Sequence, residues 1–114
     1  MSDFTYETKL DSLIITPKVA RLTSEKGELI QEVLNKVNTE QPESIIVDFK
    51  EVEYIDSVGI QFIVILHNAQ DERKKKSAFI GLRPDLTKLL TITKVDELVK
   101  IYSSLEEAMA QTKD

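Results

Sequence analysis

The hydrophobic pattern of the chain predicts several short strands. Apolar and polar residues alternate over 4–10, which is typical of a strand with one buried face. An apolar run at 13–16 follows closely and stops before Pro17, so the first two strands are expected to form an antiparallel hairpin. The run at 44–49 is nearly all apolar, as expected for a strand covered on both faces. Two further short apolar runs predict strands at 78–80 and 98–102.

Longer segments with a helical hydrophobic period predict helices. The first is expected to begin at an N-cap on Thr23 or Ser24 and to end before a polar loop at 38–43. The second is expected to run from Ser57 to about Arg73. The basic residues at its end complement the negative end of the helix dipole.

Two shorter helices are predicted in the last third of the chain. Pro84 suits the first turn of a helix. A capping box of Ser103 with Glu106, or of Ser104 with Glu107, would begin the last one. The resulting order, β-β-α-β-α-β-α-β-α, predicts an α/β fold with a mixed sheet of about five strands covered by about four helices.

Composition narrows the function classes. The 114 residues, 41% of them hydrophobic, suit a single domain over 1–114. The net charge of −5 argues against direct nucleic-acid binding. With no cysteine and only one histidine, His67, thiolate chemistry and a histidine-rich metal site are excluded, and His67 is interpreted as structural. No apolar run is long enough to insert into a membrane, and the N-terminus does not resemble a signal peptide, so we expect a cytoplasmic protein.

The sequence Asp56-Ser57-Val58-Gly59 lies between a predicted strand and the second helix. Aspartate is a preferred N-cap, and a helix N-terminus favours negative charge. Ser57 would then be the first helical residue, where a phosphate would change the local charge by about −1.5 to −2. Gly59 would allow close packing on the sheet or close approach of another backbone. A metal site at Asp56 is not expected, because no second ligand is evident nearby in the sequence.

The second helix has two distinct faces. At 100° per residue, one side should face the sheet and carries Gly59, Phe62, Ile63 and Leu66. The opposite side carries Ser57, Gln61, Val64, Ile65 and Asn68. Its two apolar residues indicate either a docking surface or cover by a neighbouring helix.

The 17–22 segment before the first helix carries two cations. Lys18 and Arg21 could meet acidic groups of a partner, or they could be ordinary solvated charges.

The stretch at 46–60 resembles the STAS domain, and within it the anti-sigma factor antagonists. It has the family pattern of a strand, a short polar turn, an apolar pair and then Asp-Ser-x-Gly. The segment at 82–90 is similar to the family's segment before its third helix. Three positions depart from the pattern: Val58 replaces a second serine, 17–22 replaces a Gly-x-Leu-Asp loop, and Thr93-Lys94-Val95 stands where Thr-Gly-Leu is frequent.

The resemblance implies a partner-switching protein that is not an enzyme. Ser57 would be phosphorylated by an anti-sigma factor serine kinase and restored by a cognate phosphatase. The chain would need no cofactor of its own and is expected to be a monomer when free. The residues assigned to partner binding are Asp56, Ser57, Val58, Gly59, Gln61, Val64, Ile65, Asn68, Lys18 and Arg21.

Two alternatives stay open. STAS-like domains also serve as regulatory subunits of membrane transport systems and as stressosome-like scaffolds. In either case Ser57 would be a docking residue and not a switch. An enzymatic role finds little support, because the sequence contains no Ser-His-Asp arrangement and no Walker loop.

Overall fold

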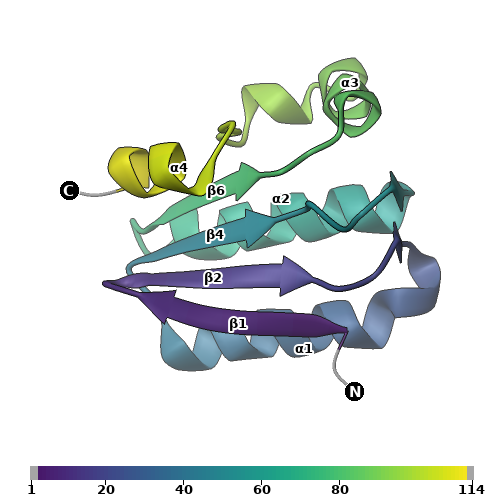
Figure 1. Cartoon of the computed structure of the whole chain (residues 1–114). Helices are drawn as coiled ribbons and strands as arrows, with labels where there is room; N and C mark the ends of the chain where they lie inside the picture. The colour runs from purple at the N-terminus through teal and green to yellow at the C-terminus, as the bar shows by residue number, and fades with distance from the viewer. Residues whose placement is uncertain (1–2, 113–114) are drawn as a thin grey trace.

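A four-stranded mixed sheet forms the centre of the computed structural model, which describes residues 3–112 (Figure 1). The strand order is β1-β2-β4-β6. β1 pairs antiparallel with β2, while β2, β4 and β6 are parallel to one another. These strands are β1 (Phe4–Lys9), β2 (Ser12–Pro17), β4 (Ser44–Asp48) and β6 (Lys76–Ile80). The N-terminal hairpin and the buried 44–49 strand are therefore confirmed, with β2 extending through Pro17.

Helices cover both faces of this sheet (Figure 1). α1 (Gly27–Glu40) and α2 (Ser57–Asp71) pack on one face, and α4 (Leu105–Thr112) packs on the other, against β4 and β6. α3 (Pro84–Ile92) lies beyond the end of β6 and contacts the 3-10 turn η2 (Val95–Glu97). The predicted α/β class with four helices is confirmed.

Two apolar clusters correspond to the two faces of the sheet. The larger one lies under α1 and α2 and includes Phe62, Ile63 and Leu66, which are almost fully buried. The smaller one joins Ile46 to Ala108 beneath α4. Because β4 contributes side chains to both clusters, both of its faces are covered, which accounts for its nearly continuous run of apolar residues.

A second, two-stranded sheet was not predicted. β3 (Arg21–Leu22) pairs in parallel with β5 (Tyr54–Ile55), so that Arg21 lies opposite Tyr54. This pairing attaches the segment after β2 to the residues directly before α2. Strands of two residues have no measurable period, which explains why the hydrophobic pattern did not reveal them.

The predicted strand at 98–102 is wrong. Only Ile101 pairs with β6, through a single parallel bridge to Phe79. The N–H groups of Leu98 and Val99 donate to the carbonyl of Val95 instead, closing the turn that follows η2. These groups are therefore not available to a sheet ladder.

The predicted boundaries of two helices also change. α1 continues to Glu40, so the loop predicted at 38–43 begins too early. The helix ends at Gln41, which has a left-handed φ of 46° and whose N–H donates to Val37. At its N-terminal end, α1 is preceded directly by the 3-10 turn η1 (Ser24–Lys26). Thr23 precedes this turn, and its side chain makes no capping hydrogen bond within the described part of the chain.

The last helix begins as one of the two proposed capping boxes indicates. The Ser104 hydroxyl accepts a hydrogen bond from the Glu107 N–H at 3.1 Å. The Glu107 carboxylate reaches back to the Ser103 N–H at 2.9 Å. Ser104 with Glu107 is therefore the pair that caps α4, and Ser103 with Glu106 is not.

Candidate functional site

The candidate site lies at the carboxyl ends of the parallel strands. Here the segment after β2, the short strand β5 and the first turn of α2 come together at one edge of the sheet (Figure 1). In open α/β sheets this edge is the usual place for a binding site, because the loops that follow each strand converge there. Figure 1 shows this edge on the right, where the small sheet meets the start of α2.

Asp56 caps two helical segments at once. One carboxylate oxygen, Oδ1, accepts hydrogen bonds from the N–H groups of Val58 at 2.8 Å and Gly59 at 3.4 Å. The other oxygen, Oδ2, accepts from the N–H of Ser24 at 3.1 Å. The predicted cap of α2 is confirmed, and the same side chain also holds the start of η1, 32 residues earlier in the chain.

These contacts keep Asp56 ionised. Partial desolvation acts to raise the pKa of the carboxyl group, but the N–H donors of Ser24, Val58 and Gly59 outweigh it. The pKa of Asp56 therefore lies below its ordinary value, since hydrogen bonds to the charged form favour that form. At neutral pH a full negative charge stands directly beside Ser57.

Ser57 is the first residue of α2 and is exposed. The helix begins here because Asp56 is extended and Ser57 onward is helical. Val58 is half-buried and carries no hydroxyl, so Ser57 has the single hydroxyl group of the motif. The first turn of α2 thus leaves Ser57 accessible to solvent.

Gly59 is required by close packing. A Cβ at this position would lie 2.7 Å from the carbonyl oxygen of Leu22 and 2.7 Å from the Cβ of Ile55. Both distances are shorter than a carbon atom tolerates. Gly59 thus lets α2 lie directly on the small β3–β5 sheet, and its tight-packing interpretation holds.

The two faces of α2 are as the periodicity indicates. Gly59, Phe62, Ile63 and Leu66 are buried. On the other side, Gln61, Ile65 and Asn68 are exposed, with Ile65 at 40%, while Val64 is half-buried against the larger core cluster. Ile65 is therefore the apolar residue of this face that is open to solvent, whereas Val64 belongs partly to the core.

The two cations of the 17–22 segment are exposed, and both make contacts within the molecule. The Lys18 ammonium lies 2.7 Å from the Glu51 carboxylate in an exposed ion pair. The Arg21 guanidinium stacks over the ring of Tyr54, 4.5 Å from its centroid. Such surface pairs contribute little to stability.

Tyr54 was missed by the sequence analysis. It is 47% exposed, lies two residues before Asp56 and presents its ring together with Arg21. Tyrosine and arginine are enriched among residues that dominate the energy of protein interfaces. What marks Tyr54 is an exposed aromatic side chain in a two-residue strand. That strand is recognised only once β3 is seen to pair with β5.

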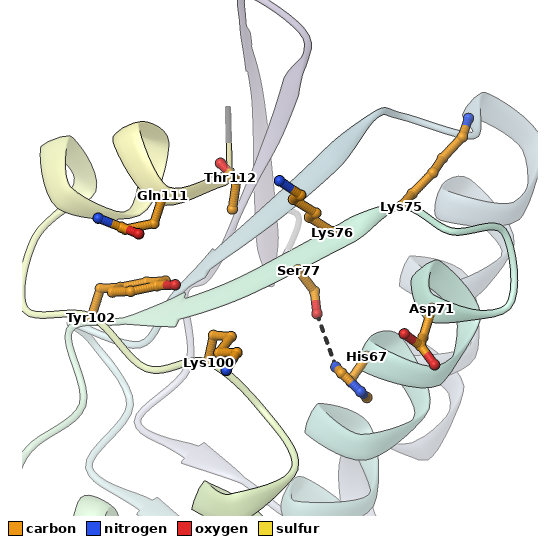
Figure 2. Close-up of a pocket in the computed structure, with 9 residues that line it drawn as sticks. All are labelled: His67, Asp71, Lys75, Lys76, Ser77, Lys100, Tyr102, Gln111 and Thr112. Atoms are coloured by element: carbon orange, nitrogen blue, oxygen red, sulfur yellow. Dashed lines mark hydrogen bonds between the residues drawn. The ribbon is translucent and has the colours of Figure 1, made fainter. Parts of the chain in front are cut away.

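A separate hollow of about 240 Å³ lies at the other end of α2 (Figure 2). His67 lines it, with Nδ1 3.3 Å from the hydroxyl of buried Ser77, which supports the structural interpretation of this histidine. Of the lysines around it, Lys75 donates to the Gln41 carbonyl at 2.8 Å and lies 3.5 Å from Glu43. The Lys75 charge is therefore paired within the chain.

Within residues 3–112 no cluster of three or more metal-ligating side chains occurs. Over the same range, no helix has the length and apolar character needed to cross a membrane.

Several solved structures superpose on this chain over nearly its whole length. A protein of Thermotoga maritima assigned as an anti-sigma factor antagonist superposes with a TM-score of 0.88 at 25% identity, over 97% of this chain and 95% of its own. An anti-sigma-factor antagonist (STAS) domain protein of Planctomyces limnophilus gives a TM-score of 0.84 at 21% identity, over 96% and 97%. The Bacillus cell fate determinant SpoIIAA in its phosphorylated form gives 0.71 at 15% identity, over 96% and 99%. The STAS domain model matches residues 5–108, and the chain therefore belongs to the STAS domain family.

Proposed function

We propose that this chain is an anti-sigma factor antagonist that works by partner switching. Unphosphorylated, it binds an anti-sigma factor kinase and so releases the sigma factor. Phosphorylated on Ser57, it leaves the kinase, and a phosphatase returns it to the active form. The observation that carries the proposal is the exposed hydroxyl of Ser57 at the first position of α2, beside an ionised carboxylate.

The phosphorylation step needs only an accessible hydroxyl on this chain. The Ser57 oxygen would attack the γ-phosphorus of ATP held by the kinase, ADP would leave, and the hydroxyl proton would pass to a base of the kinase. ATP and magnesium belong to the kinase, so the chain needs no cofactor of its own. SpoIIAA, an anti-sigma factor antagonist with this fold, exists in unphosphorylated and phosphorylated forms.

Electrostatics supply the reason for release. A phosphate at Ser57 adds about −1.5 to −2 charges to a site where Asp56 is already ionised. Inside a close interface such a group is costly unless cations of the partner compensate it. Of the two cations in the 17–22 segment, Lys18 gives little compensation because its charge is already paired with Glu51.

The proposed docking surface combines three features at one edge of the molecule: the first turn of α2, the exposed side of that helix with Ile65, and the Arg21–Tyr54 pair. On the exposed side of α2, the polar residues Gln61 and Asn68 flank Ile65, and an apolar centre with a polar rim is usual for a transient interface. We propose that the free protein is a cytoplasmic monomer that meets its kinase through this surface.

Capture of the partner from native lysate tests the proposal. The unmodified chain, Ser57→Ala and Ser57→Asp would be compared, with bound proteins identified by mass spectrometry. Asn35→Asp is a matched control, since Asn35 is exposed on α1 and gains the same single charge. We expect a kinase of ATPase fold on the unmodified chain, on Ser57→Ala and on the control, and more than about tenfold less on Ser57→Asp because an uncompensated charge is costly inside a close interface.

Other outcomes identify the alternatives. A transporter subunit captured equally by all four proteins would favour the transport-system role, with Ser57 as a docking residue. A large assembly of STAS proteins, seen as a high molecular mass in solution, would favour a stressosome-like scaffold. Equal capture of the kinase by Ser57→Asp would refute the switch.

A further inference from the structure

Several contacts join the start of α2 to the segment that precedes α1. β3 pairs with β5, Gly59 packs on the carbonyl of Leu22, and Asp56 accepts the N–H of Ser24. The first two are a backbone ladder and a steric contact. The third is made by a charged side chain, and it is the one of these three that a new charge nearby would perturb.

A phosphate on Ser57 would compete directly with Asp56. Asp56 Oδ1 occupies the N–H groups of Val58 and Gly59, which are the donors that a helix N-terminus offers to an anion. A phosphate one residue away would be attracted to the same donors and would repel the Asp56 carboxylate. Displacing this carboxylate also removes the acceptor from Ser24, because both oxygens belong to one rigid group.

We propose that Asp56 is a positioning residue that holds the η1 turn, Ser24–Lys26, beside Ser57 in the arrangement the partner recognises, and that a phosphate on Ser57 releases this turn. The inference rests on the proposed function for the partner's role. The turn carries the exposed residues Ser24 and Glu25 next to the Arg21–Tyr54 pair, so its release would alter the docking surface beyond the phosphate itself.

Substitution of Asp56 by serine separates this role from ordinary helix capping. Serine is as good an N-cap as aspartate, so its one oxygen keeps the Val58 N–H satisfied. A single oxygen cannot also reach Ser24. Asp56→Ser should therefore keep α2 folded while losing the link to η1, and its urea-unfolding midpoint should fall only by what the lost Ser24 hydrogen bond accounts for. Asp56→Asn is a second variant, since its amide offers only one acceptor oxygen.

The test is hydrogen exchange of individual backbone amides by NMR on the unmodified chain, Asp56→Ser, Ser57→Glu and the Asn35→Asp control. We expect exchange at Ser24 to quicken roughly two- to tenfold in Asp56→Ser and Ser57→Glu, as loss of one hydrogen bond implies. Val58 should stay protected in Asp56→Ser, and the control should match the unmodified chain. Capture of the partner should fall in Asp56→Ser although α2 stays folded.

The two proposals fail in different ways. Unchanged Ser24 exchange in Ser57→Glu would overturn the role of Asp56, even if Ser57→Asp loses the partner through direct repulsion. Full partner capture by Asp56→Ser with a released η1 would also overturn it. If Ser24 exchange quickens but Ser57→Asp binds the partner normally, the link exists and the switch does not.

Discussion

Replacing Gly59 by alanine should destabilise the protein, although alanine is the better helix former. The added methyl group would stand 2.7 Å from the Leu22 carbonyl oxygen and 2.7 Å from the Ile55 Cβ. Neither neighbour can turn aside, because one is backbone and the other is the first side-chain atom of a buried residue. α2 must then move away from the small β3–β5 sheet.

The size of the effect follows from two opposing terms. Forcing one methyl group into a packed site costs about 1–3 kcal/mol. Alanine in place of glycine in a helix returns up to about 1 kcal/mol. We therefore expect a net loss of roughly 1–2 kcal/mol of unfolding free energy. For a chain of this length that corresponds to a Tm lower by about 4–8 °C.

Urea unfolding followed by circular dichroism measures the difference, with Gly27→Ala as the control. Gly27 begins α1 with a φ of −54°, and apart from its chain neighbours and its own helix backbone no described atom lies within 4 Å of an added Cβ. This variant should gain about 0.4–1 kcal/mol because the unfolded chain becomes less flexible. If Gly59→Ala were as stable as the unmodified chain, the close approach of α2 to β3 would be refuted.

Three further predictions concern other parts of the structure. Leu10 is 86% exposed with a φ of 55°, so Leu10→Gly should stabilise the hairpin turn by about 1 kcal/mol in urea unfolding, and an unchanged midpoint would contradict the left-handed conformation. Gln70 is fully buried, and its side-chain amide donates to the carbonyls of Pro42 and Lys76 at 3.1 and 3.0 Å. Gln70→Leu should lower the unfolding free energy by about 1–3 kcal/mol, although leucine is the more hydrophobic residue, because both carbonyls lose the Gln70 donor. A stabilised variant would refute this bridge. The lowered pKa of Asp56 means that its ionised carboxylate stabilises the fold fully above about pH 5, and that this stabilisation is lost as the pH falls below the ordinary aspartate pKa of about 3.9. The difference in unfolding free energy between the unmodified chain and Asp56→Asn should therefore shrink from pH 7 to pH 3. A constant difference would show that the pKa is not lowered.

The sequence predicts those parts of the fold that depend on local pattern. The buried strand at Ser44–Asp48, the two faces of α2 and the Asp56 cap follow from runs, periods and capping preferences within a few residues. Each of these features arises from neighbours along the chain, so no knowledge of distant contacts is needed.

Features that depend on distant contacts could not be predicted in this way. The β3–β5 pairing and the Ser24 hydrogen bond of Asp56 join residues more than 30 positions apart. The segment at 98–102 has the apolar content of a strand, but the preceding turn uses the N–H groups of Leu98 and Val99. Tyr54 became a candidate binding residue only when the small sheet placed it beside Arg21.

The most direct test of the central claim is to incubate the captured kinase with magnesium and ATP in the presence of the unmodified chain or Ser57→Ala, and to follow both the complex and the phosphate by mass spectrometry. We predict that the unmodified chain gains one phosphate, located on Ser57, and leaves the complex, while Ser57→Ala stays bound and unmodified. A complex that persists after Ser57 is phosphorylated, or a phosphate placed on another residue with the same release, would contradict partner switching at Ser57.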